Sequence, residues 1–302
     1  MARRNNRNKT LEQQAKAIIK ARTSINKDND QVEMPGNYKG MQSIRSSNDT
    51  ADALAKIARE MKVKRIKQIT PEAAEKYLQI RQDNFASQKS LDRDRKALSI
   101  ALHKVMPRLK AVSEQTLSSR SYNREQIKSI TSAMSEKNSL ATKIAYDAGL
   151  RAHELITLKR VEEGEKTSSR TWTDDRFSGR EGERYLVTGK GGLVREVQIS
   201  KKLSEQLESR RLSQPKVRVD RKVNYVQRYD LGGGNALSAS FTRAAQRALG
   251  FSHGLHGTRH TYAQERVDEL KRFYKISHDD ARDIVAQELG HFRGDITETY
   301  LR

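Results

Sequence analysis

Apolar residues recur every three or four positions through the first third of the chain, which is the period of an amphipathic helix. One stripe follows the capping-box sequence Thr-Leu-Glu-Gln at Thr10, and another follows Thr70 and Pro71, a cap and a first-turn proline. The stripes predict helices over residues 10–22, 49–62, from 71 onward and 87–106. The last is expected to bury Leu91, Leu98, Ala101, Leu102 and Val105. Residues 10–106 are therefore predicted to form a small helical domain.

The periodicity stops over residues 107–123, a Ser- and Arg-rich stretch typical of a linker, and resumes in a second predicted domain, residues 124–302. There, RYLVT and LVREVQIS flank Gly-Lys-Gly-Gly and predict a β-hairpin. Helices are expected over 127–134, 140–149, from 151 onward, 201–211 and 236–249, with 214–234 irregular. The predicted fold is therefore mainly α with one small antiparallel β-sheet.

Charge narrows the choice of partner. The 59 Lys and Arg exceed the 38 Asp and Glu by 59 − 38 = 21 positive charges, an excess that favours binding to a polyanion such as DNA or RNA. Candidate phosphate contacts are Arg3 and Arg4 in a basic arm, residues 1–9, and Lys89, Arg93 and Lys96 on one face of the fourth helix. The sequence has neither a long apolar segment nor an apolar signal core, so no membrane association is expected.

The chain has no cysteine, which excludes disulfides, thiolate nucleophiles and cysteine-ligated zinc. His253, His256 and His260 lack a matching carboxylate pattern, and the paired aspartates at 174–175 and 279–280 lie in predicted loop or helix-start positions. We therefore expect no metal site and no cofactor. A cytoplasmic protein associated with the nucleoid fits this composition.

Seven side chains are candidates for chemistry, and the basic groups, the imidazole and the phenol among the last four could together hold and attack a phosphodiester. In chain order they are Arg151, Glu154, Lys190, His256, Arg259, His291 and Tyr300. Taken singly, most have an ordinary explanation: Arg151 and Glu154 match a surface ion pair, and Lys190 matches an exposed lysine in a turn. The Gly-Lys-Gly-Gly run is not a phosphate-binding P-loop, because it lacks the earlier glycine and the following Ser or Thr.

As an ordered set, these residues and their surroundings resemble the tyrosine recombinases, the phage integrase and Xer family. The matching segments are AYDAGLRAHELITLKR, YLVTGKGG, HGTRHTYA and LGHFRGDITETYL, and Tyr300 follows His291 by nine residues as in that family. The resemblance covers nearly the whole chain. It implies a helical, SAM-like core-binding domain, an α+β catalytic domain, and site-specific recombination in the integration or excision of a mobile element. Double-stranded DNA and further copies of the chain, from dimer to tetramer, are the implied partners.

The resemblance also implies a role for each residue, without metal or ATP. Tyr300 would attack the scissile phosphate and form a 3′-phosphotyrosyl link. Arg151 and Arg259 would clamp the non-bridging oxygens, and Lys190 would protonate the leaving 5′-oxygen. His256 would assist proton transfer at the tyrosine, His291 would hydrogen-bond a phosphate oxygen, and Glu154 would support Arg151 or His256. Tyr262 is a rival nucleophile in sequence, but its place on the Arg259 helix favours a packing role.

Two alternative functions remain compatible with these residues. One is a type IB topoisomerase-like enzyme that nicks and reseals a single duplex. The other is a catalytically silent DNA-binding relative. The Arg259-to-His291 segment is also longer than usual for the family, at 32 residues, which is expected to lengthen a helix or the loop that follows it.

Overall fold

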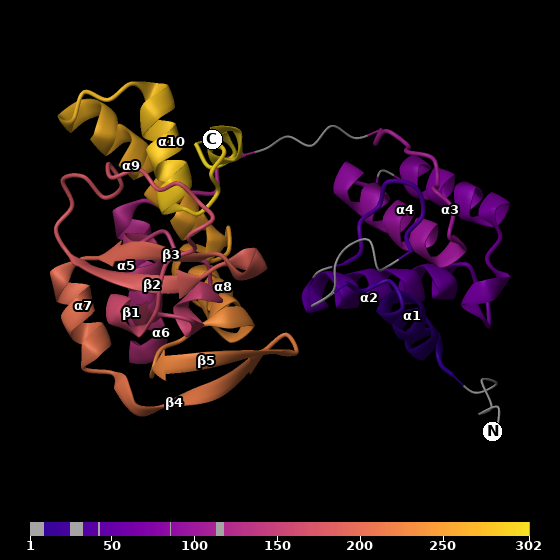
Figure 1. Ribbon diagram of the computed structural model, residues 1–302, viewed down its shortest axis with the longest axis horizontal. Helices are drawn as coiled ribbons and strands as arrows, with labels where there is room; N and C mark the ends of the chain where they lie inside the picture. Colours follow the sequence, from indigo (N-terminus) through magenta and orange to yellow (C-terminus); the bar gives the residue numbers. More distant parts are fainter. Residues whose placement is uncertain (1–8, 25–32, 42, 85, 113–117, 302) are drawn as a thin grey trace. The chain divides into compact units, whose positions relative to one another are not determined.

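The computed structural model describes residues 9–24, 33–41, 43–84, 86–112 and 118–301. The chain divides into two compact units, Met1–Thr116 and Leu117–Arg302, whose elements are drawn in Figure 1. The proposed DNA contacts Arg3 and Arg4 lie outside the described residues.

The first unit is helical, as the periodicity predicts. Its helices are α1 (Leu11–Lys20), α2 (Ile44–Glu60), α3 (Pro71–Asp83) and α4 (Gln88–Leu102). The capping box at Thr10 is confirmed, since its side chain accepts from the amide of Gln13 and the Gln13 side chain accepts in return. Thr70 likewise caps α3. Helix α2 begins earlier than the predicted residue 49 because Ser43 caps it by accepting from the Ser46 amide.

One predicted core position of this unit is wrong. Helix α4 ends at Leu102 because His103 takes the left-handed conformation, with φ at 53°. The helical period no longer applies beyond that residue. Val105 is therefore 48% exposed, while Met106 is 1% exposed and packs with Leu98 in the core.

The second unit combines helices with two small antiparallel sheets (Figure 1). Its helices are α5 (Arg124–Ser132), α6 (Glu136–Asp147), α7 (Lys201–Glu208), α8 (Gly234–Leu249), α9 (His256–Phe273), α10 (His278–Glu288) and α11 (Gly294–Glu298). Its strands are β1 (Lys159–Arg160), β2 (Glu183–Thr188), β3 (Val194–Ile199), β4 (Arg211–Asp220) and β5 (Val223–Tyr229). The predicted hairpin is the β2–β3 pair, and β1 adds a third strand beside β2.

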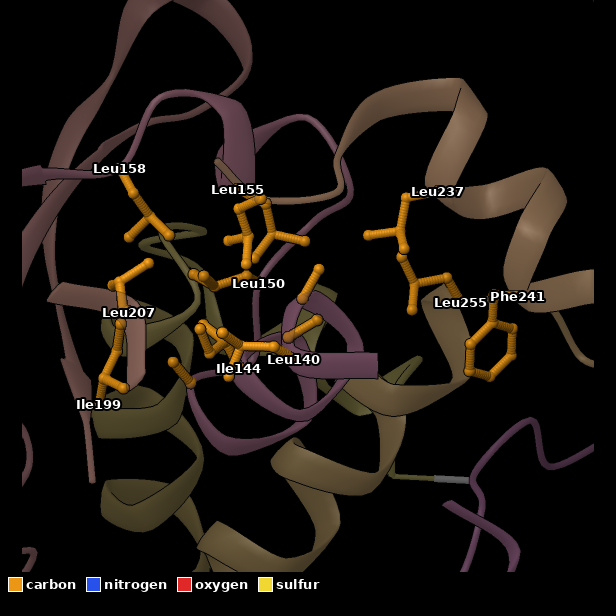
Figure 2. Packing of buried hydrophobic residues seen from close by; sticks show 14 of the residues in the cluster. Leu140, Ile144, Leu150, Leu155, Leu158, Ile199, Leu207, Leu237, Phe241 and Leu255 are labelled. Carbon is orange, nitrogen blue, oxygen red and sulfur yellow. The ribbon is translucent and has the colours of Figure 1, made fainter. Parts of the chain in front are cut away.

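Apolar side chains from helices and strands meet in the main core of this unit. Figure 2 shows Ile144 of α6 near Leu150 and Leu140, with Ile199, Leu207 and Phe241 contributed by β3, α7 and α8. A second cluster joins α9 and α10 and includes Tyr262, Leu289 and Tyr300. The predicted packing role of Tyr262 agrees with its 4% exposure. Within the described ranges, no helix is long and apolar enough to cross a membrane.

Two predictions for this unit are corrected by the structure. Arg151 does not begin an α-helix; a single 3₁₀ turn, Glu154–Ile156, follows it. The segment 214–234 is not irregular, because most of it forms the β4–β5 hairpin, which is a second sheet. Its turn residues Arg221 and Lys222 both have positive φ, 49° and 66°. Since neither is Gly, Asn or Asp, the usual sequence signal for such a turn is missing.

We expect Leu98→Ala to lower the free energy of unfolding of the first unit by about 3 kcal/mol, because Leu98 is fully buried and its truncation leaves a cavity. Val105→Ala is the matched control and should change it by less than about 0.5 kcal/mol, since Val105 is exposed. Urea unfolding of the two variants measures both values. Equal losses would show that Val105 belongs to the core after all.

Candidate active site

A glycine turn directs the chain from helix α6 into the candidate site. Gly149 has φ at 62°, a conformation that favours glycine. A Cβ atom there would also lie 2.7 Å from the ring of Tyr262 and 2.9 Å from Leu289. The carbonyl of Gly149 accepts a hydrogen bond from Arg259. One residue therefore both turns the chain toward Arg151 and holds a second arginine.

The carboxylate of Glu154 is the centre of the site. It is 0% exposed and accepts from the backbone amide of Arg151 at 2.8 Å and from its guanidinium at 2.8 Å. Arg195 of β3 donates to the same carboxylate at 3.1 Å, and the Arg259 guanidinium lies 3.9 Å away. Three arginines from three separate segments are thus gathered around one buried negative charge.

These contacts decide the protonation state of Glu154. Burial alone raises a carboxyl pKa, but the positive charges of Arg195, Arg259 and Arg151 outweigh it, so the pKa of Glu154 lies well below its usual range. Burial and the charge of Arg151 lower the pKa of Arg259 to about 9, which still leaves that guanidinium charged at neutral pH.

Sequence reasoning missed Arg195, although a signal was present. Strand β3 alternates, and Arg195 falls on the same inward positions as Val197 and Ile199. A charged residue at an inward position of a strand needs a buried partner, and here that partner is Glu154. The Nε and Nη1 atoms of Arg195 are buried and have no hydrogen-bond partner among the residues that the structure describes.

His291 lies between the two arginines of the predicted set. Its Nε2 atom is 2.9 Å from Arg151 Nη2 and 3.2 Å from Arg259 Nη2. Because guanidinium groups only donate, this nitrogen is the acceptor, and the ring proton is on Nδ1. That Nδ1 atom is buried, with no partner in the described part of the chain. Burial and the charges of Arg259 and Arg151 lower the pKa of His291 to about 3, so the ring is neutral at pH 7.

The charges around Glu154 do not balance. Three guanidiniums against one carboxylate leave 3 − 1 = 2 positive charges in a cluster that is buried except for the partly exposed Arg151. The neutral His291 offers a lone pair to Arg151 and Arg259 but no charge. The site can therefore hold an anion whose oxygens take the place of the His291 nitrogen.

Tyr300 lies directly beside this cationic centre. Its side chain is 7% exposed, and the Arg259 guanidinium carbon is 5.7 Å from the centre of its ring. Tyr300 comes just after the short helix α11 rather than within it. The Gln264 side chain of α9 donates to its backbone carbonyl at 3.0 Å. The phenol is thus held against helix α9 from a separate segment of the chain.

Three imidazoles surround the Tyr300 ring. The ring centres of His260, His291 and His256 lie 4.7, 5.2 and 5.4 Å from its own. Desolvation in the site, followed by neighbouring arginine charges, lowers the pKa values of His256 and His260 to about 4 each. At neutral pH both are proton acceptors. His260 was missed as a site residue, although it lies one helical turn after His256, on the face that bears that histidine.

The structure brings six of the seven predicted side chains into this site. The seventh is Lys190, whose backbone lies in the β2–β3 turn Lys190–Gly192; its side chain is outside the described part of the structure. A Cβ atom built on the preceding Gly189 would lie 3.3 Å from Glu154 Oε1. The backbone of the turn therefore reaches the centre of the site.

The remaining predicted contacts lie in the first unit. Lys89, Arg93 and Lys96 follow one another at helical spacing on α4. The Arg93 guanidinium donates to the buried carboxylate of Asp94, which Arg81 also contacts.

Among the residues that the structure describes, no group of three or more His, Asp or Glu has the arrangement of a metal site.

Comparisons with known proteins give a structural match. Neither a scan against protein-family models nor a search of curated proteins finds a match. A lambda integrase tetramer bound to a Holliday junction matches with a TM-score of 0.55 and 15% identity, over 86% of this chain and 72% of that chain. The XerH site-specific recombinase in a pre-cleavage complex with difH substrate matches at 0.51 and 19%, over 86% and 76%. The Tn1549 transposon integrase in complex with circular intermediate DNA matches at 0.51 and 13%, over 98% and 96%.

These solved structures are tyrosine recombinases, and at such identities the likeness is one of fold. The chain has the tyrosine recombinase fold, which confirms the fold that the sequence motifs implied.

We expect Glu154→Gln to lower the free energy of unfolding of the second unit by about 3 kcal/mol at pH 7, because it leaves three guanidiniums without a buried counter-charge. Glu163→Gln is the matched control. Glu163 also accepts from two arginines, Arg211 and Arg228, but it is 25% exposed, so its loss should cost less than about 1 kcal/mol. Urea unfolding of both variants measures the difference.

The pH dependence of that difference has a defined sign. The pKa of Glu154 is lower in the folded state than its ordinary value of 4.5, so the unfolded chain takes up this proton first as pH falls. The stabilisation is complete above about pH 4.5 and is lost below it. The gap between wild type and Glu154→Gln should therefore stay constant from pH 7 to about pH 5 and then narrow. A variant as stable as the wild type at pH 7 would contradict the central role of Glu154.

Proposed function

We propose that this protein is a site-specific DNA recombinase that cleaves and rejoins strands through a 3′-phosphotyrosyl intermediate, in the integration or excision of a mobile element. The observation that carries the proposal is the position of Tyr300, against Arg259 and three neutral imidazoles, beside a buried cluster with two uncompensated positive charges. A nucleophile, its proton acceptors and an anion site thus lie together. The tyrosine recombinase fold and the DNA complexes of its solved relatives support the same function.

The first step is an attack by the Tyr300 hydroxyl on the scissile phosphorus. A phosphorus–Oη bond forms as the bond to the 5′-oxygen breaks, and the phenolic proton passes to the neutral imidazole of His256. Lys190 gives a proton to the departing 5′-oxygen, since the turn that carries it reaches the site. The phosphate stays esterified to Tyr300, so the 5′-hydroxyl of another strand can reseal it without an external energy source.

Arg151 and Arg259 stabilise the charge that grows on the non-bridging oxygens. Both guanidiniums are held before DNA arrives, Arg151 by Glu154 and Arg259 by the carbonyls of Gly149 and Leu289. When phosphate oxygens replace His291 Nε2 as the acceptor, the imidazole turns and donates its Nδ1 proton to the phosphate. Arg195 keeps Glu154 in place from the other side.

We assign further phosphate contacts to the first unit, through Lys89, Arg93 and Lys96 of α4, and to the arm with Arg3 and Arg4. In this proposal the substrate is double-stranded DNA of the nucleoid in the cytoplasm, and copies of the chain assemble on it as dimers and tetramers. A lambda integrase tetramer bound to a Holliday junction is one such assembly.

We expect Tyr300→Phe to abolish covalent capture of a duplex that carries a nick beside the cleavage site, while DNA binding changes less than about twofold, since only the nucleophilic oxygen is lost. Tyr262→Phe is the matched control. Tyr262 lies on the helix that carries Arg259, but its hydroxyl donates to the buried Glu288, so that variant should still form the adduct. Denaturing gel electrophoresis of the reaction detects it. A robust adduct from Tyr300→Phe would refute the assignment.

We expect Lys190→Ala to slow cleavage of an ordinary duplex by about 100-fold or more, as for loss of a general acid. The variant should cleave a duplex with a 5′-bridging sulfur at nearly the wild-type rate, because a thiolate leaves without a proton. Single-turnover rates on the two substrates test this. Equal loss on both would remove Lys190 from the acid role.

A further inference from the structure

The β4–β5 hairpin has an exposed apolar face that the proposed cleavage site does not use. In Figure 1 the hairpin extends from the body of the second unit as a two-stranded ribbon. Val217, Val219 and Val226 are 69%, 64% and 48% exposed. The register pairs Val217 with Val226 and Val219 with Asn224, so all four side chains are on one face. Three exposed valines side by side indicate a surface that binds a partner molecule.

The opposite face holds the ribbon to the body of the unit. Arg218 donates to the carbonyls of Leu231 and Gly233 at 3.0 Å each. Asp220 accepts from the amide of Asn235 at 2.7 Å. The valine face is therefore held outward by a row of polar contacts.

The ribbon is also attached to the segment that carries the candidate site. The centre of the Tyr225 ring of β5 lies 6.4 Å from that of the His153 ring. His153 directly precedes Glu154 in the sequence. The amide of Gly234, after β5, donates to the carbonyl of Ala152 at 2.7 Å. A strand of seven residues is roughly 23 Å long. The valine face is thus within about one turn of DNA, roughly 34 Å, of a phosphate held by Arg151.

Charge identifies the class of partner. Residues 211–229 contain six Lys or Arg and one acidic residue, Asp220, which is already hydrogen-bonded. The turn places Arg221 and Lys222 at the exposed tip. A second copy docked on this face would bring the same cationic tip against it, which is unfavourable. A polyanion is attracted by the same charges.

We propose that the outward face of the β4–β5 hairpin enters the major groove and contacts base edges of A·T pairs beside the cleavage site. This inference rests on the proposed function. A two-stranded ribbon fits the width of the major groove. The methyl groups of Val217, Val219 and Val226 match thymine methyls, and the Asn224 amide matches the donor and acceptor on the adenine edge. Lys222 at the tip contacts phosphate.

The test is selection of binding sites from a pool of duplexes of random sequence, using the full chain. The wild type should select sites with a short A·T-rich element within about one turn of the cleaved position. The double variant Val219→Ala/Asn224→Ala should lose the preference at those positions and bind the wild-type site about 10-fold more weakly, as expected for loss of a direct base contact. Because both residues are exposed, its thermal unfolding should match that of the wild type.

Two further variants separate base contacts from general effects. Lys222→Ala should weaken binding to all sequences alike and reduce the salt dependence by about one phosphate contact, with the selected sequence unchanged. Gln214→Ala, at an exposed position earlier in β4, is the control and should change neither the affinity for DNA nor the selected sequence.

Several results would overturn the inference. One is an unchanged selected sequence in the double variant, or wild-type sites without an A·T-rich element. Another is a DNA-free wild type that sediments as a dimer while Val217→Lys is a monomer, which would assign the face to a second copy of the chain. Failure of the proposed function is a separate result. A wild type that selects the A·T-rich element but forms no covalent adduct would support the base contact and refute the proposed recombinase function.

Discussion

The buried carboxylate of Glu154 is the interaction on which the site depends. It accepts from Arg151 and Arg195, lies close to Arg259, and has no exposed surface. These arginines come from the turn after α6, from β3 and from α9, so one residue connects the segments that build the site. Without its charge, the buried guanidiniums of Arg195 and Arg259 and the partly exposed one of Arg151 would have no counter-ion, an arrangement that is strongly destabilising.

The Glu154 carboxylate neutralises only part of the positive charge around it, and the remaining positive charge can attract an anion. The three guanidiniums around Glu154 carry two positive charges more than that carboxylate, and the neutral His291 occupies the acceptor position between Arg151 and Arg259. In the proposed reaction a phosphodiester would supply acceptor oxygens and one negative charge at this position, and folding has oriented the donors before the substrate binds. Tyr300 and the imidazoles of His256 and His260 lie on the adjoining side, where attack on such a phosphate would begin.

Local signals predicted much of this structure. The caps at Thr10 and Thr70 and the Gly-rich β2–β3 turn were recognisable because short-range chemistry determines them. The sequence predictions that the structure corrected failed because the conformation there depends on long-range contacts or on atypical residues. Val105 is exposed because a left-handed His103 ends its helix, and β4–β5 was missed because its turn uses Arg and Lys. The candidate residues were found from their order in the chain. Arg195 and His260 were missed, although Arg195 lies at an inward position of β3 and His260 lies one helical turn after His256.

The most direct test of this account is a structure of the chain with a nicked duplex and vanadate. Vanadate adopts the five-coordinate geometry that phosphorus has in the transition state of phosphoryl transfer. The account predicts vanadate between the Tyr300 hydroxyl and the free 5′-hydroxyl, with its equatorial oxygens on Arg151 and Arg259 and with His291 turned away from its present place between them. Vanadate held by other residues, with Arg151 and Arg259 still donating to His291, would contradict it.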